Sequence, residues 1–296
     1  MQHTISRRRF VRTSLIAAAG VSFSGYRCLA SKSSIPQHIG LQLYSVRDNI
    51  TQNPVSVLAA VAKMGYREVE AYGFEKGNLF GLSYADFGKA LADNNLTMPS
   101  THCAVTLADY DPQNNQISDA LKKCVDTAAA MGLQYVICPW MRIEDRPLIA
   151  QMLPVYQAMA RYCQQAGVRF AYHNHNFEFE QRGPDNRLLI EWILQETDPA
   201  LTAMEMDIYW VTYAGHNPLD WIRLYPGRWE LCHAKDMAQT EGRPTVEIGE
   251  GVIDFKTIFE QRKAAGFQYF IVELEHYRTT PLQGVELARE GLLTMF

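Results

Sequence analysis

The sequence predicts an α/β fold made of a single (β/α)8 barrel, and three observations support this prediction. Short apolar runs alternate with longer amphipathic segments eight times between residue 39 and the C-terminus. Parallel strands need a connecting helix, so this alternation favours a parallel sheet. The chain has 296 residues, 47% of them hydrophobic, which suits a closed barrel of roughly 250 residues.

The eight expected strands are short and mostly apolar: Ile39–Tyr44, Glu68–Ala71, Thr97–Cys103, Tyr135–Cys138, Arg169–His173, Ala203–Asp207, Glu230–Ala234 and Tyr269–Glu273. The eight expected helices lie between and after them: Val55–Met64, Tyr84–Asn94, Ile117–Met131, Pro147–Ala166, Leu188–Glu196, Pro218–Leu224, Phe255–Ala265 and Pro281–Thr294. Several helices end at a glycine, which closes a helix in the left-handed conformation. An open doubly wound sheet is the alternative, and it is disfavoured because no G-x-G-x-x-G follows the first strand.

The N-terminus has the pattern of a twin-arginine export signal. Three consecutive arginines, Arg7 to Arg9, precede an apolar run of small residues from Leu15 to Phe23. We therefore expect a signal peptide over residues 1–30 and a barrel catalytic domain over residues 31–296, with a periplasmic or exported location. A membrane anchor is the alternative, but this run is shorter than the roughly 20 apolar residues that cross a bilayer. No membrane span is expected after cleavage.

The charge balance argues against a nucleic-acid partner. The full chain has a formal charge of −4, and its first 30 residues hold five arginines and no acid. Removing them leaves a net charge of about −9, which offers no basic surplus for a phosphate backbone.

The five cysteines beyond residue 30 form no C-x-x-C pair, so we expect buried thiols rather than a disulfide framework or a zinc knuckle. The sequence does not decide between a monomer and a homo-oligomer.

Polar residues collect where the expected strands end. In a barrel of this kind, catalytic groups lie at the C-terminal strand ends. The ends here are Glu70, Ser100 to His102, His173 to Asn176, Glu205 to Asp207, His233 to Asp236 and Glu273 to His276. This distribution predicts an active site at that end of the barrel.

Three of these residues predict a metal site. Asp207, His233 and Glu273 end neighbouring strands and should converge on one point. Mixed oxygen and nitrogen ligands suit Mn²⁺, Co²⁺ or Zn²⁺, and the alternative is a set of buried, hydrogen-bonded polar groups. A fourth ligand should come from the fifth strand, where His173 and His175 point to one face because they are two residues apart. One would bind metal and the other substrate.

The other candidates would contact a substrate. Glu70 and His102 are expected to hold hydroxyl groups, Lys235 an oxygen of the substrate or of an enediolate, and Glu178 could swing over the site. The alternative for Lys235 is a lysine on the protein surface, and the alternative for Glu178 is a solvated acid in a loop. Five aromatic residues could form a sugar-stacking rim, although aromatic residues more often belong to the core; they are Tyr44, Trp140, Phe177, Tyr209 and Trp210. No G-x-S-x-G or Walker sequence is present, which leaves acyl transfer and nucleotide hydrolysis unsupported.

Taken together, the strand-end motifs resemble the xylose isomerase-like TIM-barrel superfamily, and within it the exported proteins called sugar phosphate isomerase/epimerase. The motifs are residues 40–45 (GLQLYS), 69–70 (VE), 172–179 (YHNHNFEF), 206–207 (MD), 233–236 (HAKD), 249–251 (GEG) and 272–274 (VEL). The resemblance implies a metal-dependent enzyme for keto-sugars or polyols. Asp207, His233 and Glu273 match three family ligands, and His173 stands where the family usually has a glutamate.

The resemblance also implies proton removal next to a carbonyl, with the metal stabilising the enediolate. His173, His175 or Glu273 would be the base. Reprotonation gives isomerisation or epimerisation, but family epimerases use two glutamates and only Glu273 is clearly available. Elimination by a lyase or hydrolase of 3-keto-glycosides or keto-polyols is the first alternative, and a non-catalytic periplasmic sugar-binding protein is the second. A DNA-repair endonuclease is disfavoured by the acidic charge and the export signal.

Overall fold

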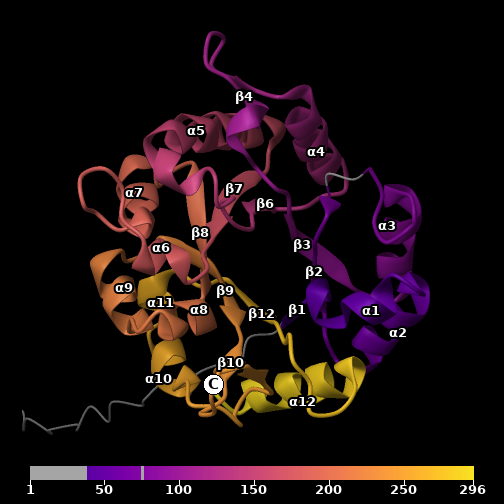
Figure 1. Ribbon diagram of the computed structural model, residues 1–296. Helices are drawn as coiled ribbons and strands as arrows, with labels where there is room; N and C mark the ends of the chain where they lie inside the picture. Colours follow the sequence, from indigo (N-terminus) through magenta and orange to yellow (C-terminus); the bar gives the residue numbers. More distant parts are fainter. Residues whose placement is uncertain (1–38, 75–76) are drawn as a thin grey trace, which may run out of the picture. The chain divides into compact units, whose positions relative to one another are not determined.

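A computed structural model describes residues 39–74 and 77–296, so the predicted signal peptide lies outside the described residues. Eight parallel strands close into a barrel (Figure 1) in the order β1-β12-β9-β8-β7-β6-β3-β2. Their bounds are Gly40–Gln42 (β1), Glu68–Ala71 (β2), Thr97–His102 (β3), Tyr135–Cys138 (β6), Arg169–His173 (β7), Thr202–Asp207 (β8), Trp229–Ala234 (β9) and Tyr269–Val272 (β12). The predicted (β/α)8 barrel is confirmed.

Helices surround this barrel (Figure 1) and alternate with its strands. The longer ones are α2 (Pro54–Lys63), α3 (Tyr84–Asp93), α4 (Asp119–Ala130), α5 (Ile149–Ala166), α7 (Leu189–Glu196), α9 (Pro218–Leu224) and α12 (Pro281–Leu293). The short ones are α1 (Arg47–Ile50), α6 (Phe177–Glu180), α8 (Ile208–Tyr213), α10 (Phe255–Glu260) and α11 (Arg262–Ala265). Side chains of Asn53, Ser83 and Ser118 cap α2, α3 and α4 by accepting a backbone N–H of the first turn, which satisfies otherwise unpaired donors.

An apolar layer inside the barrel supports the polar strand ends. Side chains alternate between the two faces of a strand, so every second residue points inward. The buried inner layer consists of Tyr135, Ile137, Ala171, Ala203, Leu231 and Ile271. Two residues further along four of these strands stand His173 (β7), Glu205 (β8), His233 (β9) and Glu273 (after β12). The strand period therefore places these polar groups together above an apolar floor.

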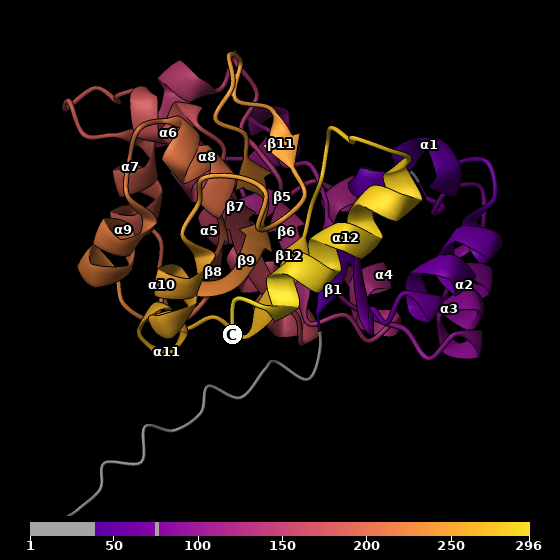
Figure 2. The same cartoon turned by 90° about the horizontal axis from the view of Figure 1, so that it is seen from below.

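The loop after β9 is longer than its neighbours and contains a hairpin of β10 (Asp236–Met237) and β11 (Thr245–Val246). Figure 2 shows β11 at the same end of the barrel as α6 and α8. The carboxylate of Asp236 holds the loop by accepting backbone N–H groups of Gly249, Gly251 and Ile253 at 2.9–3.2 Å. A second hairpin, β4 (Tyr110–Asp111) with β5 (Gln116–Ile117), follows β3. The sequence pattern predicted neither hairpin.

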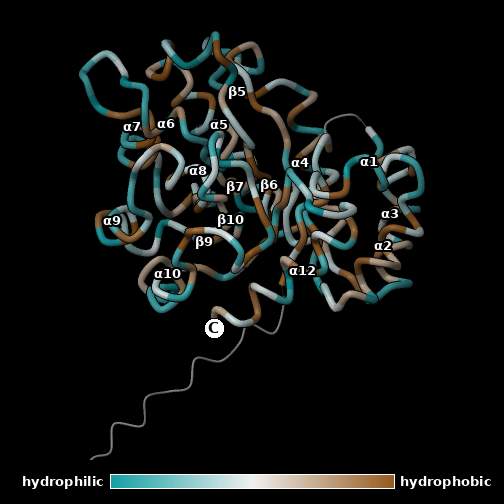
Figure 3. The backbone as a smooth tube through the Cα atoms, turned by 60° about the horizontal axis from the view of Figure 1, so that its bottom comes forward, coloured by the Kyte–Doolittle hydropathy of each residue, from teal (hydrophilic) through white to brown (hydrophobic). Residues whose placement is uncertain are grey.

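Hydropathy follows this arrangement. The strand β6 carries hydrophobic residues, whereas the segment leading into α7 is hydrophilic (Figure 3). Within the described ranges, no helix is both long enough and apolar enough to cross a membrane.

Candidate active site

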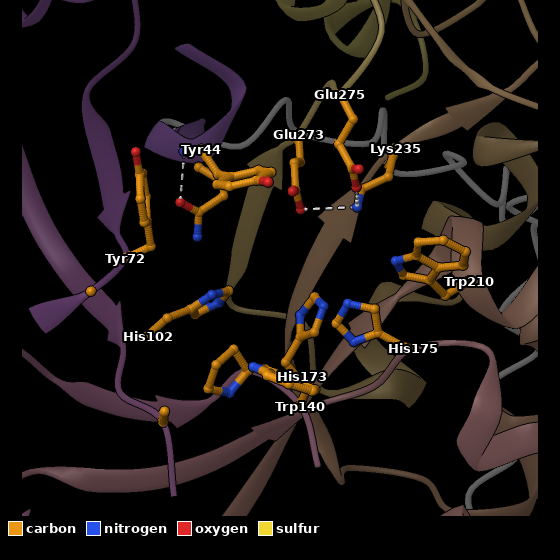
Figure 4. Close-up of a pocket in the computed structure, with 14 residues that line it drawn as sticks. Tyr44, Tyr72, His102, Trp140, His173, His175, Trp210, Lys235, Glu273 and Glu275 are labelled. Atoms are coloured by element: carbon orange, nitrogen blue, oxygen red, sulfur yellow. Dashed lines mark hydrogen bonds and ion pairs between the residues drawn. The ribbon is translucent and has the colours of Figure 1, made fainter. Parts of the chain in front are cut away.

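A pocket of about 430 Å³ opens at the C-terminal ends of the strands. Glu273, Glu275 and Lys235 lie on one side of it, and His102, His173 and His175 lie on the other (Figure 4). Tyr44 and Tyr72 flank one edge and Trp210 the opposite edge. The remaining lining residues are Gln42, Gly73, Ala104, Pro139 and Trp140.

Three of the predicted metal ligands meet beside this pocket, and the fourth, His173, lies next to them. Asp207, His233 and Glu273 each offer a ligand atom within 4.8 Å of the others. His233 Nδ1 lies 2.7 Å from Glu273 Oε2, and His173 Nε2 lies 3.8 Å from Asp207 Oδ2. These residues end β7, β8 and β9 or follow β12, so neighbouring strands bring together side chains that lie up to 100 residues apart in sequence.

The ammonium group of Lys235 lies between two of these carboxylates. Its Nζ is 3.2 Å from Asp207 Oδ2 and 3.2 Å from Glu273 Oε2. A third carboxylate, Glu275, is closer, with Oε1 at 2.8 Å. The lysine is 1% exposed, so it acts as a buried internal cation rather than as the surface lysine that was the alternative. It therefore competes with any bound cation for the same carboxylate oxygens.

A second layer of buried carboxylates supports the histidines. Glu70 Oε1 lies 2.8 Å from His233 Nε2, and Glu205 Oε2 lies 3.0 Å from His173 Nδ1. An imidazole that is neutral and donates its one N–H to the carboxylate that faces it has a lone pair on the opposite nitrogen. Those opposite nitrogens, His233 Nδ1 and His173 Nε2, are the ones that approach Glu273 and Asp207.

An alternative set of four groups also lies within metal-binding range: His102, His173, Glu205 and His233. In this set, however, the facing nitrogens of His102 and His233 are also paired with Glu70, a carboxylate outside the set. His102 Nε2 lies 2.9 Å from Glu70 Oε1 and 3.3 Å from Glu205 Oε2, and His233 Nε2 lies 3.3 Å from Glu205 Oε2. The hydrogen-bond pattern therefore favours the inner set, with Glu70 and Glu205 as its support.

Burial and charge set the protonation of the site. Burial raises the pKa of Asp207 to about 6 and lowers the pKa of His175 to about 3. Burial alone would raise the pKa of Glu273, but the ammonium of Lys235 holds it well below its ordinary value. Burial alone would likewise lower the pKa of His233, but the carboxylates of Glu205 and Glu70 raise it well above the ordinary value.

The residues present fit a divalent cation. Asp207 Oδ2 is buried and, within the described part of the chain, accepts no hydrogen bond, although the ammonium of Lys235 lies 3.2 Å away. Two carboxylates and the imidazole of His233, with a second imidazole, His173, beside Asp207, are donors suited to Mn²⁺, Co²⁺ or Zn²⁺. Asp207 Oδ1 accepts the backbone N–H of Trp210 at 3.0 Å, which fixes the carboxylate with its free oxygen toward the site.

Some of the predicted substrate residues line the pocket and others do not. His102, Trp140, His175 and Lys235 line the pocket, as do Tyr44 and Trp210 of the expected aromatic rim. Glu70 does not line it and is fully buried behind the histidines. Glu178 is also fully buried and accepts hydrogen bonds from Tyr172 Oη and from the backbone N–H of His175, so its contacts support the strand end rather than reach into the pocket.

Sequence reasoning assigned no individual role to several residues of the site: Gln42, Tyr72, Glu205 and Glu275. Glu205 lies two residues before Asp207, so the strand period already placed both on the inner face. Gln42 and Tyr72 belong to no metal-ligand or acid–base pattern in the sequence, and only the closed barrel brings them to the pocket.

Comparison with known proteins identifies the family. The model of the xylose isomerase-like TIM barrel matches residues 58–295. The chain belongs to this family. Among curated relatives, the inosose dehydratase of Geobacillus kaustophilus is 23% identical over 264 residues, which cover 77% of this chain and 81% of the relative.

Solved structures agree with this fold. A sugar phosphate isomerase/epimerase from Parabacteroides distasonis has a TM-score of 0.76 and 27% identity, covering 89% of this chain and 96% of that chain. The IolI protein, whose structure contains a bound zinc atom, has a TM-score of 0.66 and 16% identity, covering 87% of this chain and 97% of its own. At that identity the second likeness shows the fold alone.

Proposed function

We propose that the protein is a divalent-metal-dependent enzyme that removes a proton next to the ketone of a keto-sugar or keto-polyol and then eliminates a substituent from the adjacent carbon. The observation that carries this proposal is the cluster of Asp207, His233 and Glu273 beside a polar pocket, with His173 Nε2 3.8 Å from Asp207 Oδ2. A divalent ion held there would supply Lewis-acid polarisation of the carbonyl.

The chain's own groups divide the work. Glu273 lines the pocket and is an acceptor for the proton, which makes it the base that we favour. Lys235 forms an ion pair with Glu275, and its ammonium can donate a proton to a developing oxyanion or to the leaving group. His102 and His175 lie on the opposite wall and would hold hydroxyl groups of the sugar. Trp140, which is 42% exposed, offers an apolar face for a sugar ring.

The positions of the carboxylates favour elimination over two-base epimerisation. Among the described lining residues, the carboxylates are Glu273 and Glu275, and both follow β12. Removing a proton from one face of a sugar and returning it to the other needs a second base on the opposite wall. Elimination can take both its base, Glu273, and its acid, Lys235, from one side of the pocket (Figure 4). Similarity to an inosose dehydratase over most of the chain supports this choice, since a dehydratase removes water from its substrate.

Isomerisation or epimerisation is the second candidate. It is favoured by the 27% identity to the sugar phosphate isomerase/epimerase from Parabacteroides distasonis, which is matched over 96% of its length. An imidazole of the opposite wall would then return the proton.

We also propose that the enzyme is exported, on the arginine pattern of residues 6–12.

The test is turnover in deuterated water. Protein loaded with Mn²⁺, Co²⁺ or Zn²⁺ is incubated with an inosose and, separately, with a 3-keto-glucoside, and the products are followed by NMR and mass spectrometry. Elimination predicts an unsaturated product that has lost water or the aglycone. Deuterium uptake into an otherwise intact sugar would instead support the second candidate. Binding without either change would contradict both and leave a sugar-binding protein.

A further inference from the structure

Two buried cysteines meet beside one wall of the pocket. Cys103 directly follows β3, and Cys124 lies in α4. Both are buried, reduced thiols in this structure, as the sequence predicted. Their Sγ atoms are nevertheless only 2.6 Å apart, about half an ångström more than the about 2.05 Å of a covalent S–S bond. Both residues are buried, with exposed fractions of 0% and 4%.

The backbone holds both cysteines in place. The N–H of Cys103 donates to the carbonyl of Ile137 in β6 at 2.8 Å. Cys124 lies one and a half turns into a helix that Ser118 caps. Because each sulfur belongs to a fixed element, the pair cannot separate without a side-chain rotation into the core or a shift of α4. We propose that Cys103 and Cys124 form a disulfide bond that ties the end of β3 to α4.

This bond would restrict the motion of the segment after β3 that lines the pocket. Cys103 stands between His102 and Ala104, and both of these line the pocket. The loop that the bond would close runs from residue 103 to residue 124 and contains the β4–β5 hairpin. The inference is independent of the proposed reaction, because it concerns only the loop and not the ligand of the site.

The chemistry requires a disulfide donor. One thiolate attacks the donor disulfide and releases a donor thiol, and the second protein thiolate then displaces the other half of the donor. The net change is loss of two protons and two electrons from the two cysteines, and the donor is reduced to two thiols. Disulfides persist in oxidising compartments such as the bacterial periplasm and are rare in the cytosol. The bond would thus form after the export that the N-terminal sequence predicts.

The test counts thiols in the full chain, which has six cysteines. Protein treated with oxidised glutathione is denatured in N-ethylmaleimide and weighed intact. We expect four adducts and a mass 2 Da below that of an all-thiol chain carrying four adducts, against six adducts after reduction. Peptide mapping should join residues 103 and 124. Because buried thiols react slowly, the same measurement is repeated on protein refolded in a glutathione redox buffer.

Single variants identify the pair. Cys103→Ser or Cys124→Ser should give five adducts under oxidising conditions, whereas Cys163→Ser should keep the bond and give three. Reduction should lower the melting temperature of the wild type by several degrees and leave that of Cys103→Ser unchanged. Six adducts from both oxidised and refolded protein, or a bond between Cys124 and the neighbouring Cys163, would overturn the proposal.

Discussion

At the scale of single residues, the candidate site depends on carboxylates that never touch the pocket. Glu205 is fully buried, and its Oε2 faces His102, His173 and His233 at 3.0–3.3 Å. A carboxylate behind a metal-binding histidine fixes the ring orientation and the tautomer. Glu70 has the same relation to His233, and it also accepts a hydrogen bond from Gln42 at 2.7 Å.

The substitution Glu205→Gln tests this supporting role. The amide can still accept one N–H, but it lacks the charge that favours the required tautomer of His173. We expect Mn²⁺ or Co²⁺ affinity to fall by about 10- to 100-fold without loss of the fold, as measured by isothermal titration of the metal-stripped protein. The control is Glu230→Gln, at the far end of β9. Equal metal affinity in Glu205→Gln and wild type would show that Glu205 does not support the metal site.

Lys235 is predicted to oppose cation binding. Replacing it with methionine removes a positive charge 3.2 Å from both Asp207 and Glu273, so the affinity for a divalent cation should rise about tenfold or more. Turnover should nevertheless fall, because the ammonium that donates to the substrate is gone. Metal titration and activity therefore move in opposite directions in Lys235→Met. Weaker metal binding in this variant would show that the lysine supports the cation rather than competing with it. Lys89→Met, on the exposed face of α3, is the control.

Glu178 should give the fold a specific pH dependence. Burial raises its pKa to about 7, so between about pH 4.5 and about pH 7 the folded chain binds a proton that the unfolded chain releases. This contribution to stability is complete below that window and is lost as the pH rises through it. Glu178→Gln lacks the titration, so the difference in unfolding free energy between wild type and variant should change by about 1–3 kcal/mol between pH 5 and pH 7.5. Urea unfolding at both values measures it, with the exposed Glu180→Gln as control. A constant difference would contradict the assignment.

At the scale of elements, the sequence predicted the strands better than the loops. All eight barrel strands lie within a few residues of their expected positions, because apolar runs and closing glycines mark them locally. The convergence of Asp207, His233 and Glu273 was predictable because the barrel rule places strand ends together. The hairpin β10–β11 was not, since it depends on Asp236 binding backbone groups 13 to 17 residues away.

Gly251 tests the packing of that loop. A Cβ at this position would lie 2.2 Å from Asp236 Oδ1 and 2.6 Å from the carbonyl oxygen of Met237, so the loop must shift and lose hydrogen bonds. We expect Gly251→Ala to lower the free energy of unfolding by about 2–4 kcal/mol. Gly88→Ala is the matched control, because it lies in α3 with no atom within 4 Å of the added Cβ. This control should be neutral or slightly stabilising. Chemical denaturation measures both, and equal stabilities would refute the packing argument.

At the scale of the whole molecule, the barrel concentrates charge in one place. Its interior is apolar around Ile137, Leu231 and Ile271, and acids, imidazoles and one lysine lie above that layer. The lysine, Lys235, is paired with Asp207, Glu273 and Glu275, and Asp207 Oδ2 accepts no hydrogen bond in the described structure. The fold is shared with proteins of different activity, so the chemistry of this chain must be decided at these residues.

The most direct test of the account is the metal content of the purified full chain, measured by elemental analysis after loading with Mn²⁺, Co²⁺ or Zn²⁺ and removal of excess ion. We predict one ion per chain in wild type and in His102→Ala, and none in Asp207→Asn or His233→Ala. The Asp207→Asn variant keeps the hydrogen bond to Trp210, so its loss of metal would not reflect an unfolded helix. A wild type that binds no ion, or an Asp207→Asn variant that keeps a full equivalent while His102→Ala loses it, would contradict the central claim.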